Sequence, residues 1–231
     1  MSLFKTILRS LWFYRKQHLA VFAGTVISTA VLTGALIVGD SVKYSLKHLV
    51  DVRLGNAGYA MQTGDRYVRA QLAPDMADLM KRPVIPLFMS QGIGVNPETE
   101  SRVNRLQVIG VDSNFRDFFE VDVPGLFGKE ALISLNLSDK LGLAKGDEFI
   151  LRVEDVSLIP LNAPFSQDAQ PSFGLRLIVK DIVDDSRMGR FSLKSNQAAP
   201  FNVFIDRDYL TGELGLTGLA NTILVSTSRI C

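Results

Sequence analysis

A long run of apolar positions near the N-terminus is the clearest pattern in this chain. Residues 19–39 read LAVFAGTVISTAVLTGALIVG and contain no charged side chain. About 20 apolar residues form a helix that is long enough to cross a hydrocarbon core about 30 Å thick. Because a bilayer offers the backbone no hydrogen-bond partners, we expect this run to cross it as a helix.

The residues before this run have the pattern of a second membrane element. Apolar residues fall on one helical face, with Lys5, Arg9 and Ser10 opposite. This pattern predicts an interfacial amphipathic helix within residues 1–18. Aromatic and basic side chains suit the head-group region, so we assign a set of residues to the membrane interface. They are Trp12, Tyr14, Arg15 and Lys16 on one side of the run and Asp40 on the other.

Helical periodicity continues beyond the apolar run. Val42, Leu46, Leu49, Val50 and Leu54 recur at helical spacing, and Gly55 follows as a natural stop. We therefore expect one transmembrane and stalk helix over residues 19–54. Gly39 is its weakest point, because glycine inside a helix costs up to about 1 kcal/mol. Such a helix would be a rigid connection between the membrane and the remaining domain.

Small residues recur at intervals of four within the run, in three pairs: Gly24 and Ser28, Thr29 and Thr33, Ala30 and Gly34. Small residues at this spacing allow another helix to approach closely in lipid. One interpretation is that these residues pack against further transmembrane helices. The other is that they are the ordinary small residues of a membrane span.

The remainder, residues 55–231, has the mixed pattern of an α+β domain. The clearest unit is a hairpin with arms at residues 84–95 and 102–111 around an Asn-Pro-Glu-Thr turn. Further strands are expected at 59–63, 131–134, 148–153, 175–183, 201–205 and 221–226. Helices are expected at 66–81, 114–119, 136–141 and 207–214, and a proline-containing loop at 154–174.

Two helix starts have candidate caps in the sequence. Ser113 or Asn114 is expected to cap the helix at 114–119, and Ser134 or Asn136 the helix that ends before Gly142. The strand near residue 223 has the apolar character of a central strand, yet few residues follow it. This suggests that the sequence is the front part of a longer protein.

The distribution of charge indicates the orientation of the chain in the membrane and excludes one class of protein. Lys and Arg cluster before the run, which favours a cytoplasmic N-terminus and an exported domain. The net charge of +1 lacks the basic excess of a nucleic-acid-binding protein. A cleaved signal peptide is the alternative, but the run is longer than a typical signal core and no Ala-x-Ala site follows it. The single cysteine, Cys231, permits no disulfide within the chain.

Residues that could carry catalysis are scarce. Neither His18 nor His48 has a partner at metal-ligand spacing, and no serine-elbow motif is present. The GLFGKE segment at residues 125–130 departs from a phosphate-binding loop, so a simple turn is favoured. Three aspartates, Asp181, Asp184 and Asp185, form either a cation site or a solvated loop, with the loop favoured. We therefore predict no catalytic, cofactor or metal site and no enzyme activity.

Several segments, in this order, resemble the MacB/FtsX-like permeases of ABC transporters. They are GDSVKYSLK at residues 39–47, GDRYVR at 64–69, SLNLSDKLGLAKGDEFILRV at 134–153, PFNVFI at 200–205 and ANTILV at 220–225. The resemblance implies a MacB-like periplasmic core domain over residues 55–231 in a bacterial inner membrane protein.

The resemblance also implies partners. Such permeases dimerise through further transmembrane helices and work with a separate cytoplasmic ATPase, which binds the ATP. Many of them transmit force to a periplasmic protein or lipoprotein. The further spans and the ATPase-coupling loop are missing from this sequence. We therefore expect a permease subunit, or its N-terminal part, with no cofactor of its own.

Two other functions remain open from the sequence. A single-span, membrane-anchored binding or sensor module would act through partner contacts alone and would have a complete exported domain. A membrane-tethered hydrolase is less favoured, because no catalytic constellation supports it.

Overall fold

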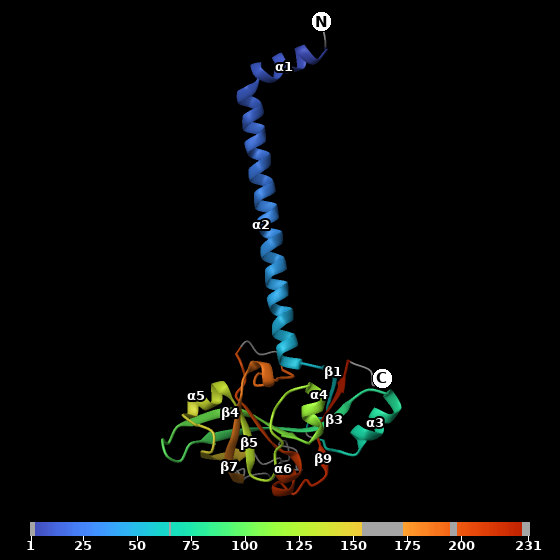
Figure 1. The fold of residues 1–231 in the computed structure, drawn as a ribbon, viewed down its shortest axis with the longest axis vertical. Coiled ribbons are helices and arrows are strands. Elements are labelled where there is room, and N and C mark those ends of the chain that lie inside the picture. Colours follow the sequence, from blue (N-terminus) through green and yellow to red (C-terminus); the bar gives the residue numbers. More distant parts are fainter. Residues whose placement is uncertain (1–2, 65, 154–172, 195–197, 228–231) are drawn as a thin grey trace, which may run out of the picture. The chain divides into compact units, whose positions relative to one another are not determined.

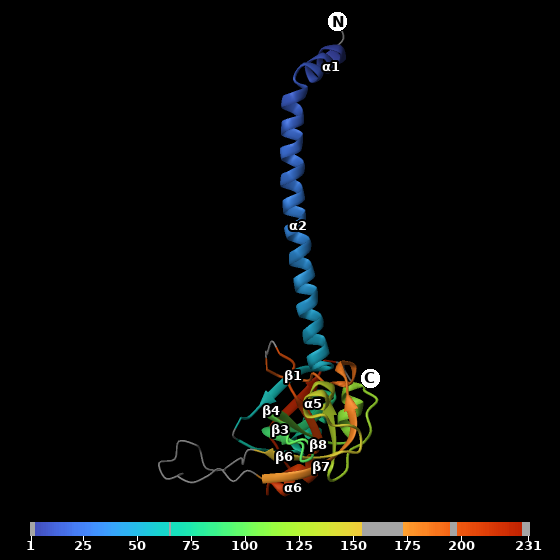
Figure 2. The ribbon, with the colours of Figure 1, turned by 90° about the vertical axis from the view of Figure 1, so that its left-hand side faces the viewer.

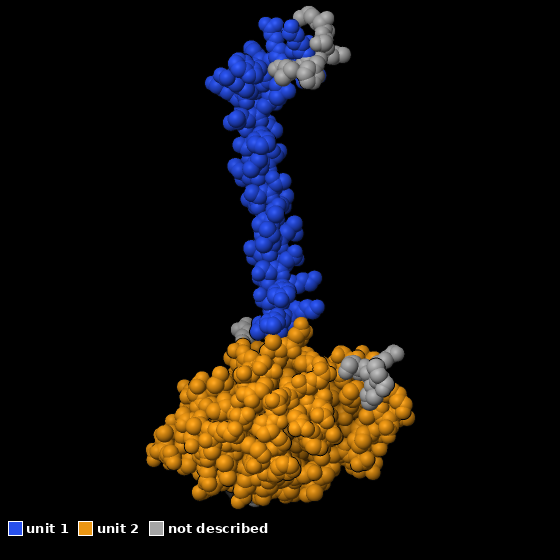
Figure 3. All heavy atoms as spheres, viewed as in Figure 1, with its two compact units in different colours: residues 1–49 blue, residues 50–231 orange. Residues whose placement is uncertain are grey.

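The structure is a computed structural model that describes residues 3–64, 66–153, 173–194 and 198–227. The chain divides into two units, residues 1–49 and 50–231, which are coloured separately in Figure 3. The expected loop at 154–174 lies almost entirely outside the described residues.

The first unit consists of helices. α1 spans Leu3–Phe13, and after the single turn residue Tyr14 the chain enters α2, Arg15–Leu54 (Figure 1). α2 begins four residues before the predicted start and ends at the predicted residue. It continues through Gly39 without interruption, and it is long and apolar enough to cross a bilayer. Its last turn, from Val50 onward, belongs to the second unit.

The pairings of the strands close into a ring at the centre of the second unit, and several of these strands are labelled in Figures 1 and 2. Going round the ring, the order is β3-β4-β8-β5-β7-β6, and β6 pairs again with β3. β10 extends the sheet from the first half of β3, and β1 pairs with β10 at the edge. The strands are β1 Ala57–Gln62, β3 Val84–Val95, β4 Arg102–Val111, β5 Glu130–Ser134, β6 Glu148–Val153, β7 Phe173–Val183, β8 Asn202–Asp206 and β10 Thr222–Ser226. A separate two-stranded sheet joins β2 Val68–Arg69 to β9 Leu219–Ala220.

Two glycines of β3 leave room for atoms packed against this strand, and Gly92 lies where β6 closes the ring. A Cβ on Gly92 would lie 2.8 Å from the carbonyl oxygen of Arg152 in β6. A Cβ on Gly94 would lie 2.7 Å from Leu106 Cδ1 in β4. The strands therefore approach each other closely only because β3 lacks side chains at these two positions.

Alternate residues of the central strands enter two different cores. In β8, Val203 and Ile205 belong to the core inside the ring, whereas Phe204 belongs to a second core on the outer face. β4 divides in the same way between Val108 and Ile109. Burial on both faces explains why these strands are almost continuously apolar in the sequence.

Short helices surround these strands, with α5 and α3 on opposite sides in Figure 1. They are α3 Leu72–Met80, α4 Asn114–Phe119, α5 Leu135–Leu141, the 3₁₀ turn η1 Asp185–Arg187 and α6 Arg207–Glu213. The predicted helix at 66–81 is too long, because residues 68–69 pair as a strand. Pro74 lies in the first turn of α3, where a missing backbone N–H costs nothing.

Both cap predictions are wrong in detail. Ser113 and Ser134 occupy the N-cap positions, but neither side chain makes a capping hydrogen bond. Asp112 Oδ1 accepts from the Asn114 N–H instead, at 3.1 Å. Ser134 Oγ accepts from the Asn202 N–H of the neighbouring strand, at 3.0 Å. At α5, therefore, a neighbouring strand uses the hydroxyl that the local rule assigns to the start of the helix.

The remaining predicted elements agree with the structure to within a few residues. Both arms of the 84–95 and 102–111 hairpin have the expected bounds, and so does the 148–153 strand. The predicted central strand is β10, whose five residues are all buried between β1 and β3. The mixed α+β class is confirmed.

Candidate coupling site

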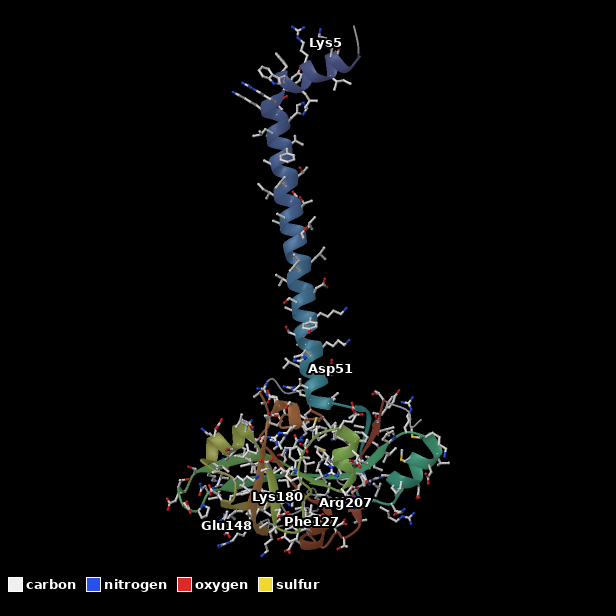
Figure 4. The ribbon with its side chains drawn as sticks, viewed as in Figure 1. Lys5, Asp51, Phe127, Glu148, Lys180 and Arg207 are labelled. Atoms are coloured by element: carbon white, nitrogen blue, oxygen red, sulfur yellow. The ribbon has the colours of Figure 1, made fainter. Side chains whose placement is uncertain are left out.

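The site begins where α2 ends inside the second unit. Gly55 follows the helix with φ +50°, a left-handed conformation that glycine adopts without strain. Its N–H donates to the Asp51 carbonyl oxygen at 2.9 Å, which closes the last turn. Figure 4 labels Asp51 on this part of the helix. A Cβ at Gly55 would lie 2.9 Å from Phe119 Cδ1 and 3.1 Å from Met188 Sδ, so the backbone here touches both side chains closely.

Asn56, the residue after Gly55, forms hydrogen bonds to two further parts of the domain. Its side-chain Nδ2 donates to the Phe118 carbonyl oxygen of α4 at 3.1 Å. Its own carbonyl oxygen accepts from the Thr227 N–H, just after β10, at 3.1 Å. The end of α2 is therefore hydrogen-bonded to a helix and to a central strand of the sheet.

Aromatic rings form the surface against which Gly55 packs. The ring of Phe119 lies 4.8 Å from Phe115, 4.8 Å from Phe118 and 5.5 Å from Phe191, measured between centroids. All four rings are buried in the outer core. Because close-packed rings have little free space around them, Phe119 cannot easily move away from Gly55.

Met188 is held in place by a compact loop around η1. Arg187 donates from Nη1 to Asp181 Oδ2 at 3.0 Å and from Nη2 to the Ile182 carbonyl oxygen at 2.6 Å. Asp184 Oδ1 accepts from the backbone N–H groups of Ser186 and Arg187, each at 3.1 Å. The Ser186 hydroxyl also donates to Asp184, and this bond is the main cause that lowers the pKa of that carboxyl below its ordinary value.

These aspartates therefore serve a structural purpose. Asp181 and Asp184 bond to Arg187, and Asp185 lies 2.7 Å from Arg190. Among the described residues, no group of three His, Cys, Asp or Glu side chains lies close enough to hold a metal ion.

Two further basic side chains of the domain are paired with carboxylates. Lys180, labelled in Figure 4, lies 2.6 Å from Glu130 and 5.5 Å from the centre of the Phe127 ring. Arg207 Nη1 lies 3.3 Å from Asp112 Oδ2. Burial raises the pKa of Asp112 above its ordinary value, and the charge of Arg207 opposes this shift only in part.

What this arrangement can do is mechanical. Gly55, Asn56, Phe118, Phe119 and Met188, here called the junction, join the end of α2 to α4, to η1 and to the end of β10 by direct packing and hydrogen bonds. A displacement of the last turn of α2 has to move these elements or break these contacts.

Comparison with solved structures identifies the fold. The crystal structure of the periplasmic region of MacB from Actinobacillus actinomycetemcomitans matches with a TM-score of 0.50 and 10% identity, covering 78% of each chain. The second unit has the MacB periplasmic fold. The extracellular domain of the noncanonic ABC-type transporter YknZ from Gram-positive bacteria also matches, with a TM-score of 0.46 and 10% identity over 74% of this chain and 84% of that one. No protein-family model and no curated protein sequence matches the chain.

The MacB-like fold agrees with the resemblance found in the sequence. The LGL-x-x-GD segment forms the end of α5, its Gly142 cap in the left-handed conformation and the turn into β6. The PFNVFI and ANTILV segments form β8 and β10, two buried strands of the sheet. Three of the five segments behind the resemblance therefore help to build the centre of the MacB-like domain.

The residues predicted at the membrane interface lie outside this MacB-like domain. Trp12 and Tyr14 lie at the end of α1 and in the turn after it, and Arg15 and Lys16 begin α2. The Arg15 guanidinium lies 5.3 Å from the centre of the Trp12 ring. Asp40 lies on α2 after the apolar run. Their membrane role stays a prediction.

The small residues of the apolar run all lie on α2 but not on one face. At 100° per residue, the pairs Gly24/Ser28, Thr29/Thr33 and Ala30/Gly34 face three different directions. Thr29 Oγ1 donates to the Thr25 carbonyl oxygen at 2.5 Å, which satisfies the hydroxyl within the helix. Packing against further helices stays a prediction.

Sequence reasoning missed most of the junction. Gly55 was recognised as a helix stop, but Asn56, Phe118, Phe119 and Met188 carried no assigned role. The one available signal was the FRDFF segment, whose aromatic residues are unusually dense for a short helix. Nothing in the sequence linked that segment to residue 55 or to Met188.

Proposed function

We propose that this chain is a permease subunit, or the N-terminal part of one, in an ABC-type export or mechanotransmission system. One observation carries the proposal. α2 continues without a break from the apolar run to the turn that packs at the junction of a MacB-like domain. A continuous helix of this kind can pass movement from a membrane span to the domain that it enters.

In this proposal the chain performs no chemistry. A separate cytoplasmic ATPase binds the ATP, and the chain contributes no cofactor and no catalytic residue. α1 lies along the cytoplasmic face of a bacterial inner membrane, with its basic residues near anionic head groups. α2 crosses the membrane, and the MacB-like domain lies in the periplasm. The span packs against further permease helices in a homodimer.

The mechanical step follows from the junction. ATP-driven closure of the ATPase moves the span, and α2 carries this movement to Gly55. Because Asn56 is bonded to both α4 and the end of β10, the movement reaches the sheet as well as the aromatic core. The domain then acts on a periplasmic protein or lipoprotein.

The test uses the full-length protein in its membrane together with the ABC-type ATPase that the proposal requires. Ser45 lies on α2 between the apolar run and the junction, and it is exposed. Proline there costs about 3 kcal/mol and kinks the helix, whereas Ser45→Ala keeps it straight. We expect ATP to change hydrogen exchange at Phe118 and Phe119 in the natural protein and in Ser45→Ala, but not in Ser45→Pro.

Two outcomes contradict the proposal. If the full-length protein never associates with an ATPase, the alternative of a single-span binding or sensor module gains support. If Ser45→Pro still binds the ATPase and still shows the ATP-dependent exchange, the helix is not the route of the movement.

A further inference from the structure

A groove of about 870 Å³ crosses one side of the MacB-like domain, away from the residues of the junction. Its size lies within the range of about 300–1,000 Å³ typical of ligand sites. Residues from β1, β3, β4 and β10 and from the segment before β8 line it. They include Gln62, Ser90, Gln91, Arg105, Lys194 and Asn221.

A β-bulge shapes one rim of the groove. Leu106 pairs with Gly92 and Val103 with Gly94, so β4 carries one extra residue against β3 here. Arg105 lies in this bulge with φ +60°, a conformation that costs a side chain about 1–2 kcal/mol. Bulges of this kind re-aim side chains and are frequent beside functional sites. The strained position places the Arg105 cation on the lining of the groove.

Asn221 lines the groove and is held by β3. Its Oδ1 accepts from the Met89 N–H at 2.8 Å and its Nδ2 donates to the Met89 carbonyl oxygen at 2.7 Å. The Asn221 side chain therefore makes two hydrogen bonds to the backbone of β3 just before β10 begins. Both ends of this amide are satisfied within the protein.

The lining has a definite chemistry. Its charged side chains are Arg105 and Lys194, and no acidic residue is found among the described lining residues. Carboxamides surround them, and each carboxamide offers donors and an acceptor to a peptide backbone. The lining also has an apolar part, made by Met89 and residues 198–201. A partner segment that carries both acidic and apolar side chains would match this lining.

We propose that the groove binds an extended segment of a partner protein in which acidic and apolar residues alternate. Side chains in an extended segment point alternately to opposite sides, so its carboxylates can contact the cations while its apolar groups contact the apolar residues of the lining. A free phosphate group fits less well, because the two cations are single side chains among neutral amides.

The groove and the junction lie at the two ends of one strand. Asn221 precedes β10 and lines the groove, while Thr227 follows β10 and its N–H donates to the Asn56 carbonyl oxygen. The strand between them is fully buried, so a movement at Asn56 reaches the groove through a stiff element. The inference rests on the proposed function in this respect, since it names the chemistry of the partner on which the domain acts.

The test measures binding alone, with the full chain in detergent and no ATPase. Fluorescence anisotropy follows a labelled decapeptide of alternating glutamate and valine. Controls are a decapeptide of alternating lysine and valine and one with the same glutamates and valines in two blocks. We expect the alternating acidic peptide to bind at least tenfold more tightly than either control, and more weakly as salt rises.

Variants locate the binding. Arg105→Gln combined with Lys194→Gln removes the groove cations and is expected to weaken binding at least tenfold. Arg176→Gln combined with Lys140→Gln removes the same charges from exposed positions outside the groove lining and is expected to leave binding unchanged. Circular dichroism checks that both double variants are folded.

Three results overturn the inference: no binding of the alternating acidic peptide, equal weakening by the two double variants, or complete displacement by inorganic phosphate. None of these results would contradict the proposed ATP-dependent movement, because the Ser45 variants test that movement separately.

Discussion

Gly55 gives the sharpest test of how the junction is built. Two separate features of the structure demand glycine there. Its φ of +50° is a conformation that other residues adopt at a cost, and its missing Cβ leaves room for Phe119 and Met188. Gly55→Ala alters both the backbone conformation and the space next to Phe119 and Met188. A second glycine in the chain allows the two effects to be measured separately.

The expected cost is the sum of two contributions. An alanine in the left-handed backbone conformation costs about 1–2 kcal/mol. An added methyl group in a packed site costs about 1–3 kcal/mol more. Met188 Sδ, at 3.1 Å, belongs to a flexible side chain and can shift. Phe119 Cδ1, at 2.9 Å, belongs to a ring enclosed by other rings and cannot shift easily. We therefore expect Gly55→Ala to lower the free energy of unfolding by about 2–5 kcal/mol.

Gly142 provides the matched control. It also follows a helix, α5, with φ +65°, and a Cβ there would meet nothing within 4 Å. Gly142→Ala therefore has the same cost of the left-handed backbone conformation as Gly55→Ala, and the same gain from a less flexible unfolded chain. It lacks the close contact that the new methyl group makes at residue 55. Asparagine tolerates the left-handed conformation better than alanine. Asparagine should accordingly restore most of the stability at residue 142 but not at residue 55.

The assay is urea unfolding of the full chain in detergent, followed by pulse proteolysis of the domain. Hydrogen exchange at Phe118 and Phe119 then shows whether the loss is local to the junction. The reasoning is refuted if Gly55→Ala and Gly142→Ala lower the unfolding free energy equally. That result would mean that Gly55 serves only as a helix stop.

Two further predictions concern the ring and one buried carboxyl. Gly92→Ala should lower the thermal unfolding midpoint more than Gly94→Ala, because its Cβ would meet the backbone oxygen of Arg152 rather than a movable leucine side chain; equal shifts would argue against the closure. Since burial raises the pKa of Asp112, the folded state keeps this proton at pH values where the unfolded chain has lost it, so its contribution to stability falls as pH rises through the raised pKa. Asp112→Asn should flatten that part of the stability curve in urea titrations at several pH values, and an unchanged curve would contradict the assignment.

Local elements were predictable because their signals are local. The 84–95 and 102–111 arms follow from apolar content on either side of an Asn-Pro turn, and both bounds agree with the structure. α5 and its end at Gly142 follow from a short helical pattern and one glycine. In these segments the hydrophobic pattern and the stop signals indicate the same structure, so single-sequence reasoning is sufficient.

Contacts between distant segments were not predictable in this way. The ring closes where Gly92 pairs with Val153, and nothing near either residue indicates that pairing. The caps failed for the same reason, because Ser134 turns to Asn202, far away in the sequence. Periodicity indicates which face of an element is buried, but it does not indicate which partner buries it.

The junction combines both situations at one residue. That a glycine ends a helix is a local statement, and it was read correctly from the sequence. That the same glycine has to be small because Phe119 lies against it depends on a contact across more than sixty positions. A glycine needed only as a stop could be replaced by asparagine, whereas a glycine needed also for space could not. Residue 55 therefore couples the end of α2 to the core through the absence of a side chain, which is why no pattern of side chains in the sequence could reveal it.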